Sequence, residues 1–281
     1  MGKWLVWLFS GVLFCVGMSA PQQHVRAQPT PSVDVALLLA VDISLSMDPD
    51  EQKLQRNGYV AAFRHPDVIK AIASGLNGRI AVSYLEWAGL ETQDVVVDWQ
   101  VIASRLDAEA FATELASRPI RRARMTSISA ALLLSLKHFG QSGVLAARRV
   151  IDVSGDGPNN SGIPVLDARR RVLDKGVVIN GLAIQIKRGQ GSYSYFDLPD
   201  LDRYYAACVI GGPGSFMLVV KDKDDFAEAI RRKLLLEIAG RHDGEARVLK
   251  TQFAPQKQRP IHGCLVGEKR WGQYLRELWR D

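Results

Sequence analysis

The sequence predicts an α/β protein with a mostly parallel central sheet and helices on both faces. Over residues 34–240, short and nearly continuous apolar runs alternate with segments whose apolar residues recur at helical spacing. Such alternation favours a parallel sheet, because consecutive parallel strands need a helical crossover between them. Hydrophobic residues make up 47% of the 281-residue chain, which is enough to bury a core and excludes a largely disordered protein.

The predicted strands are apolar runs that stop at polar or turn-forming residues. The run from Val33 to Val41 is almost continuously apolar and ends at Asp42, as expected for a strand buried on both faces. Two later runs flank a turn at Gly89, which predicts a hairpin. In chain order, we expect strands over 33–41, 79–87, 94–102, 149–154, 177–186 and 216–220.

The predicted helices begin or end at residues that favour helix termini. Pro66 starts a second helix directly after the first, because proline lacks the N–H group that a helix interior needs. Asp107 is the expected N-cap of the third helix, whereas Gly140 and Gly240 end the fourth and the last. In chain order, we expect helices over 50–64, 66–74, 107–117, 126–139, 164–175, 198–207 and 222–239.

The basic charge of the chain lies outside this region. The chain has 36 basic and 30 acidic residues, a net charge of +6. Residues 1–27 carry +2 and residues 241–281 carry +4, so the body over 28–240 is neutral. A neutral body argues against nucleic acid as a partner, because a nucleic-acid-binding domain needs a basic face.

Residues 1–27 have the pattern of a secretory signal peptide. Lys3 precedes an apolar stretch over 4–18, and small, Gln and Pro residues follow. We therefore expect a secreted or periplasmic protein. The alternative is an uncleaved membrane anchor, for which the apolar stretch is a little short.

Removal of the signal peptide leaves two of the three cysteines. Cys15 lies in the apolar stretch, and Cys208 and Cys264 remain. An even pair in an exported protein favours one disulfide, which would tie the basic tail to the main domain. Two separate buried thiols are the alternative.

Three polar clusters fall at the expected ends of strands or at the start of a helix. Asp42, Ser44 and Ser46 follow the first strand, Thr126 opens an apolar helix, and Asp156 follows the strand at 149–154. Ligands collect beyond the carboxyl ends of strands in such sheets. Carboxylate and hydroxyl oxygens suit Mg²⁺, with Mn²⁺ or Ca²⁺ as alternatives, better than zinc or copper. Five such groups leave a sixth position, which an Asp or Glu carboxylate of a protein partner would complete.

These segments resemble the motifs of von Willebrand factor type A domains. Residues 42–47 resemble the first motif of their metal-ion-dependent adhesion site, Thr126 with Ala131-Leu132 resembles the threonine motif, and 150–157 resembles the strand that ends in Asp-Gly. The resemblance covers about residues 33–240 and implies a doubly wound fold with one antiparallel edge strand. The longer pattern, with its glycines at 211–214, resembles exported bacterial proteins that have no assigned activity. The metal shell that the resemblance implies is Asp42, Ser44, Ser46, Thr126 and Asp156.

The chain departs from the family pattern at three positions beside this shell. Leu45 stands where the family usually has Gly, Met125 stands where Gly normally precedes the threonine, and Gly155 replaces a common Thr. We expect a binding module and not an enzyme. The alternatives are a Mg²⁺-dependent phosphoryl-transfer enzyme, whose phosphatase pattern needs a second Asp where Ser44 stands, and a purely structural metal site plugged by Leu45.

The basic tail over 241–281 combines a predicted linker with a short amphipathic segment. Prolines and polar residues indicate the linker over 251–260. An apolar stripe at helical spacing follows, flanked by arginines, and could lie on a membrane surface or bind a partner. Docking onto its own domain is the favoured interpretation, because so short a helix is weakly stable alone. The stripe consists of Trp271, Tyr274, Leu275, Leu278 and Trp279.

Overall fold

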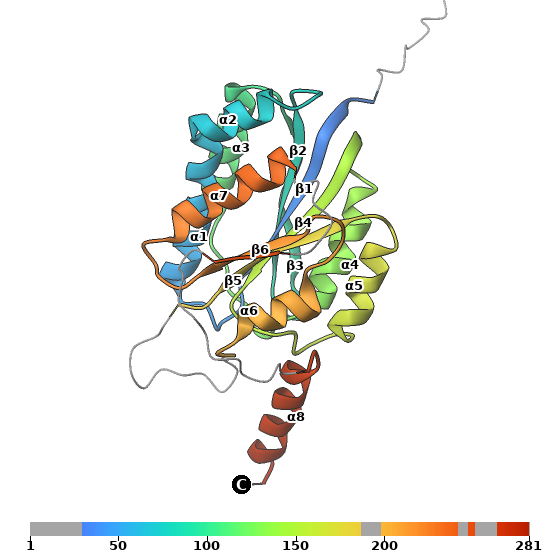
Figure 1. The fold of residues 1–281 in the computed structure, drawn as a ribbon. Coiled ribbons are helices and arrows are strands. Elements are labelled where there is room, and N and C mark those ends of the chain that lie inside the picture. Colours follow the sequence, from blue (N-terminus) through green and yellow to red (C-terminus); the bar gives the residue numbers. More distant parts are fainter. Residues whose placement is uncertain (1–29, 187–197, 241–246, 251–262, 281) are drawn as a thin grey trace, which may run out of the picture.

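A seven-stranded sheet forms the centre of the protein (Figure 1). The computed structural model describes residues 30–186, 198–240, 247–250 and 263–280. The predicted signal peptide and the predicted linker lie outside these residues. The strand order is β3-β2-β1-β4-β5-β6-β7. The strands are β1 (Ser32–Asp42), β2 (Ile80–Trp87), β3 (Gln93–Ile102), β4 (Leu145–Gly155), β5 (Val178–Ile184), β6 (Phe216–Val220) and β7 (Arg247–Lys250).

The pairing of the strands confirms the predicted doubly wound sheet. Strand β1 pairs in parallel with β2 and with β4, and β4 to β7 continue in parallel. Only the β2–β3 pair is antiparallel within the described chain, so β3 is the expected antiparallel edge strand. Strand β7 was not predicted, because a four-residue strand is too short to show a periodic pattern. It lies within the segment assigned to the tail.

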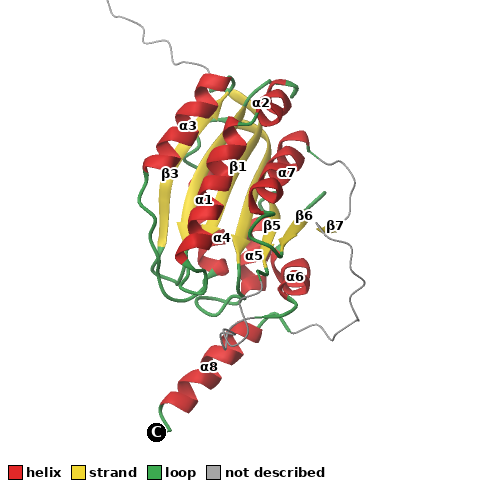
Figure 2. Ribbon diagram, turned by 90° about the vertical axis from the view of Figure 1, so that its left-hand side faces the viewer, coloured by secondary structure: helices red, strands yellow, loops and turns green. Residues whose placement is uncertain are grey.

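Helices cover both faces of the sheet, as Figure 2 shows with α1, α3 and α7 in front of it. Helices α1 (Pro49–Arg64), α2 (Pro66–Ala73), α3 (Arg105–Ser117) and α7 (Phe226–Ala239) pack on one face. Helices α4 (Ile128–Phe139), α5 (Val165–Leu173) and α6 (Leu201–Tyr204), with the π-helical turn Tyr205–Val209, pack on the other. Helix α8 (Val266–Leu278) extends from the body.

The residues of β1 divide between two hydrophobic cores. Val35, Leu37 and Leu39 face the core beneath α1, α3 and α7. Their neighbours Leu38 and Ala40 face the core beneath α4 and α5. Successive side chains of a strand point to opposite faces, so a strand between two helical layers must be apolar at nearly every position.

Several helices begin at other residues than the sequence predicted; α6 begins at Leu201 and not at 198, and α7 at Phe226 and not at 222. Ser104, and not Asp107, caps α3, and its hydroxyl accepts the N–H of Asp107 at 3.2 Å. Helix α4 begins at Ile128 with Ser127 as its N-cap, so Thr126 precedes the helix and does not open it. In both α3 and α4 a serine caps the helix, and its hydroxyl accepts an otherwise free N–H of the first turn.

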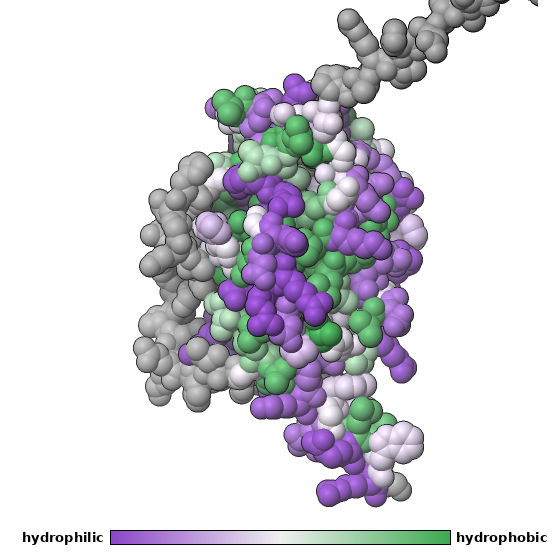
Figure 3. All heavy atoms as spheres, turned by 90° about the vertical axis from the view of Figure 1, so that its right-hand side faces the viewer, coloured by the Kyte–Doolittle hydropathy of each residue, from purple (hydrophilic) through white to green (hydrophobic). Residues whose placement is uncertain are grey.

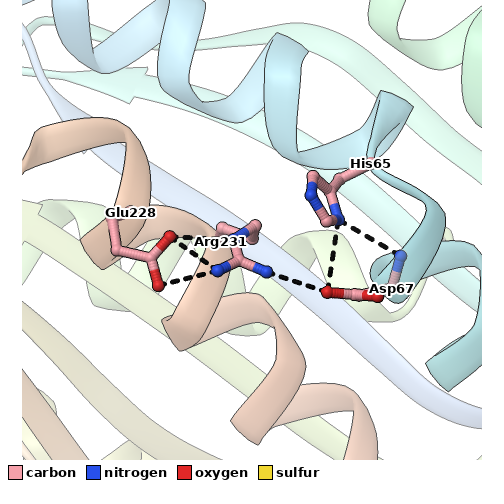
Figure 4. A network of polar contacts seen from close by, with 4 residues as sticks. All are labelled: His65, Asp67, Glu228 and Arg231. Carbon is pink, nitrogen blue, oxygen red and sulfur yellow. Dashed lines mark hydrogen bonds and ion pairs between the residues drawn. The ribbon is translucent and has the colours of Figure 1, made fainter.

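A polar network joins α2 to α7 on one face (Figure 4). Arg231 of α7 binds Asp67 at the start of α2 at 2.9 Å and also binds Glu228 of its own helix. His65 caps α2 by accepting the N–H of Asp67 at 3.2 Å. These side chains are largely exposed, so the network orients the two helices and contributes little to stability.

The tail is joined covalently to the main domain. Cys208, in the π-helical turn after α6, forms a disulfide with Cys264, just before α8. This is the pairing that the even cysteine count favoured. None of the helices within the described ranges has the length and apolar content required to cross a membrane.

Candidate metal centre

Four of the five predicted metal ligands form one chain of hydrogen bonds. Asp42 is fully buried at the end of β1, and its Oδ1 accepts the N–H of Ser44 at 2.6 Å. The hydroxyl oxygens of Ser44 and Ser46 lie 2.7 Å apart, and Ser46 donates to Oδ1 of Asp156 at 2.6 Å. The carboxyl ends of the neighbouring parallel strands β1 and β4 bring the two carboxylates to one edge of the sheet.

The fifth residue, Thr126, lies beside the loop that follows Asp156. Its N–H donates to the side chain of Asn160 at 2.8 Å, and its carbonyl accepts the N–H of Asn160 at 2.8 Å. Its hydroxyl oxygen lies 3.8 Å from the position that a Cβ on Gly157 would take. The structure therefore places all five residues at the same edge of the sheet.

The segment before Thr126 is paired with the turn that carries the serines. Ala123 forms a parallel bridge with Ser44, and its carbonyl accepts the N–H of Leu45 at 2.9 Å. The side chain of Arg122 donates to the carbonyls of Leu45, at 2.9 Å, and of Met47. These hydrogen bonds from Arg122 stabilise the turn that carries the serines, a role that the sequence does not reveal.

The electrostatics of the site favour a bound cation. Burial, and then the negative charge of Asp156, raise the pKa of Asp42 well above its ordinary value. Asp42 Oδ2 is buried and has no hydrogen-bond partner within the described residues. An unpaired buried carboxylate oxygen is costly, and a divalent cation would satisfy it and offset the repulsion between the two acids. The donor set, two carboxylates and three hydroxyls, fits a hard divalent ion.

A cation site at this edge of the sheet would need hydroxyl oxygens as ligands. Within the described ranges, no three His, Cys, Asp or Glu side chains gather in a way that could hold a metal ion. Asp42 and Asp156 are therefore not joined by a third acid or a histidine. A cation at this edge would depend on the serines and the threonine to complete its coordination.

Backbone geometry accounts for the glycine that the family has at position 125 and for the glycine of this chain at position 155. Met125 has φ of 72°, a left-handed conformation that favours glycine, which is the usual residue there in the family it resembles. A Cβ on Gly155 would lie 2.8 Å from Asp42 Oδ2 and 2.9 Å from the hydroxyl of Tyr205. Gly155 therefore leaves room for the tyrosine beside the buried carboxylate.

The third departure, Leu45, is about half exposed. Residue 45 is 47% exposed, whereas Ser44 beside it is 2% exposed. This exposure argues against a site sealed from solvent by Leu45.

No local sequence pattern assigns Tyr205, Asn159 or Asn160 to the site. Tyr205 lies far along the chain in a segment that indicates only a helix, yet its buried hydroxyl reaches the corner between Gly155 and Asp42. Burial, and then the charge of Asp42, raise the pKa of Tyr205 well above its ordinary value. Asn159 and Asn160 belong to the turn-rich loop over 157–162, which the sequence places near the site, although turn formation alone explains its composition. No local pattern distinguishes these residues from ordinary loop and core residues.

Comparison with known proteins gives a family and a fold. A sequence model described as "Protein of unknown function (DUF1194)" matches residues 32–242. No curated protein sequence matches the chain. Among solved structures, proximal thread matrix protein 1 from the mussel byssus is 12% identical with a TM-score of 0.54, over 74% of this chain and 49% of that one.

Two further structures are similar. The same byssus protein with a zinc-occupied MIDAS motif is 14% identical with a TM-score of 0.54, over 74% of this chain and 48% of that one. The pilus adhesin SpaC from Lactobacillus rhamnosus GG, in its open conformation, is 14% identical with a TM-score of 0.52, over 75% of this chain and 30% of that one. The chain spans about half the length of the byssus protein or less. At such identities the likeness concerns the fold, which is von Willebrand factor type A-like. By its sequence, the chain belongs to the family described as "Protein of unknown function (DUF1194)".

Proposed function

We propose that the protein is an exported binding module that holds a divalent cation and captures an acidic group of a protein partner. The hydrogen-bonded chain from Asp42 through the two serines to Asp156, which leaves the buried Asp42 Oδ2 unpaired, carries this proposal. Asp42, Ser44, Ser46, Thr126 and Asp156 would hold the ion. When bound, it would supply positive charge and an open coordination position for an Asp or Glu carboxylate.

The surroundings of the site suit such a partner. Leu45 offers an exposed apolar contact at the rim, next to the serines that face the ion. Arg122 holds the backbone of the same turn, so little conformational entropy is lost when a partner binds. Mg²⁺ is the proposed ion because all five donors are oxygens, and Mn²⁺ or Ca²⁺ could replace it.

Two of the similar structures support the same general class of function, metal binding or adhesion. One byssus structure has zinc in its MIDAS motif, and SpaC is a pilus adhesin. Their sequence identity to this chain is low, so the metal and the partner of this chain rest on its own residues. We propose no enzymatic activity, because residue 44 is a serine and the phosphatase pattern needs an aspartate there.

The proposed organisation follows the sequence. Residues 1–27 are a signal peptide that directs the chain to the periplasm or the exterior, residues 28–240 are the binding module, and residues 241–281 are the tail. Peripheral membrane contact would use the far end of α8, where Leu278 and Trp279 are exposed.

The proposal is tested by measuring Mn²⁺ binding to the exported protein by electron paramagnetic resonance, with Mg²⁺ as competitor. We expect one Mn²⁺ site in the wild type and its loss in Asp42→Ala. Asp50→Ala is the matched control, because its carboxylate is exposed at the start of α1. Absence of binding in the wild type, or equal binding in Asp42→Ala, would contradict the proposal.

A second experiment tests capture of a partner. Proteins retained on the Mg²⁺-loaded module should be released by EDTA, and retention in EDTA would contradict the metal-bridged mode of capture.

A further inference from the structure

Helix α8 contacts the body in its first turn and at the residue Cys264 just before it. Figures 1 and 3 show it protruding below the rest of the protein. Cys264 anchors it to Cys208, and Val266 packs against the core beneath α4 and α5. The far end of the helix is exposed, with Trp279 at 84%. The contacts of this first turn therefore hold α8 against the body.

The first turn of α8 packs directly onto the loop that follows Asp156. A Cβ on Gly267 would lie 2.0 Å from the carbonyl oxygen of Asn159, so only glycine permits this approach. The next residue, Glu268, accepts a hydrogen bond from the Asn159 side-chain amide at 2.8 Å. The contact is both close and directional.

Asn159 connects this helix to the elements around the candidate metal centre. It is fully buried, and its Oδ1 accepts the N–H of Ser129 in the first turn of α4 at 3.0 Å. Its own N–H donates to the hydroxyl of Tyr204 at 3.1 Å. The neighbouring Asn160 holds Thr126 by the two hydrogen bonds described above. The loop over 157–162 therefore joins Asp156 to Thr126, and α8 closes its outer side.

A second connection runs through the disulfide. Cys208 lies in the π-helical turn Tyr205–Val209. The first residue of that turn, Tyr205, places its hydroxyl beside Gly155 and Asp42. The anchored end of α8 is thus joined to both sides of the proposed site, through the loop and through this turn.

We propose that α8 is a disulfide-tethered clamp that holds the 157–162 loop, and with it Asp156 and Thr126, in the conformation that binds the cation. Asn159 and Glu268 are positioning residues and not ligands. The inference rests on the proposed metal site and assigns the tail a part in it. Apparent affinity falls in proportion to the fraction of molecules in the competent conformation. If loss of the clamp lowers that fraction to about one tenth, Mn²⁺ affinity falls about tenfold.

The first experiment compares two glycine substitutions in the same helix. Gly267→Ala drives a Cβ into the Asn159 backbone, whereas a Cβ on Gly272 would meet only an Arg276 side-chain atom at 3.6 Å. We expect Gly267→Ala to weaken Mn²⁺ binding about tenfold and Gly272→Ala to leave it unchanged. Both substitutions raise intrinsic helix propensity, so a difference between them reflects the contact.

Two further variants separate positioning from stability. Glu268→Gln keeps an oxygen that can accept the Asn159 amide, and Glu268→Ala removes it, so Mn²⁺ affinity should be retained in the first and reduced in the second. The double variant Cys208→Ser/Cys264→Ser should reduce affinity as Gly267→Ala does. Circular dichroism checks that each variant is folded.

Hydrogen exchange of residues 157–162 in the metal-free protein distinguishes failure of the clamp from failure of the site. Faster exchange in Gly267→Ala and in the double cysteine variant, together with weaker Mn²⁺ binding, supports the clamp. Unchanged exchange overturns it, whether or not the wild type binds Mn²⁺. Faster exchange with unchanged Mn²⁺ affinity overturns its role at the site and leaves the proposed function intact. Absence of Mn²⁺ binding in the wild type overturns the proposed function and, with it, the role of the clamp in metal binding.

Discussion

Replacing Glu237 with glutamine tests how a buried ionic cluster controls the pH dependence of stability. Beneath α7, the Lys233 ammonium binds the carboxylate of Asp152 at 2.6 Å and also binds that of Glu237. All three side chains are almost completely buried, and Asn180 donates a further hydrogen bond to Glu237 at 3.2 Å. Two carboxylates thus share one ammonium in the core. The hydroxyl of Tyr59 also faces the cluster and donates to Asp152 at 3.3 Å.

The magnitude follows from the pKa of Glu237. Burial, and then the charge of Asp152, raise this pKa from 4.5 to about 7. Between these values the folded protein keeps a proton that the unfolded chain has lost, so the free energy of unfolding falls as pH rises. At about 1.4 kcal/mol per pKa unit, the stability lost between the two values is at most about 3 kcal/mol. Below pH 4.5 this contribution is fully present, and above about pH 7 it is lost.

The assay is urea unfolding at several pH values between about 5 and 8, followed by fluorescence. Glu237→Gln removes the titrating group and keeps an oxygen for Lys233, so its stability should depend on pH less steeply than that of the wild type. Glu228→Gln, on the exposed side of the same helix, is the control and should retain the wild-type slope. Equal slopes in Glu237→Gln and the wild type would refute the reasoning.

Three further predictions concern the candidate metal centre. Met125→Gly should raise the free energy of unfolding in urea by about 0.5–1 kcal/mol, because glycine adopts the left-handed conformation at this position without strain. Met125→Ala keeps a Cβ and should leave the free energy of unfolding no higher than that of the wild type. Gly155→Ala should lower the free energy of unfolding by about 1–3 kcal/mol, because the added Cβ collides with Asp42 and Tyr205. An unfolding midpoint equal to that of the wild type would contradict this. Mg²⁺ at about 100 times its Kd should stabilise the wild type by about 2.7 kcal/mol and leave Asp42→Ala unchanged, and equal midpoints with Mg²⁺ and with EDTA would contradict the site.

The sheet edge links the fold to the proposed function. Strands β1 and β4 are neighbours, so Asp42 at the end of β1 and Asp156 directly after β4 lie at the same edge of the sheet. The loops add the serines, Thr126 and the exposed Leu45. A rigid core therefore positions the carboxylates, while shorter segments complete the donor set and offer contacts to a partner.

The sequence by itself determined the features that depend on local pattern. A nearly unbroken apolar run over 33–41 predicts a central strand, and β1 lies between two helical layers. The turn at Gly89 predicts an antiparallel hairpin, and the family resemblance implies that one of its strands lies at the edge of the sheet. The polar residues that directly follow β1 and β4 predict which side chains reach the edge. Each of these signals is carried by a short stretch of consecutive residues, so it can be recognised without knowledge of the fold.

Only the tertiary structure decided how distant segments touch this edge. Tyr205 reaches Gly155 because a π-helical turn packs on the sheet, and the Gly267–Asn159 contact exists because α8 is anchored there by the disulfide. The pairing of Thr126 with Asn160 likewise joins two loops. Such contacts depend on the packing of side chains and backbones far apart in the chain, and periodicity and capping patterns carry no information about them.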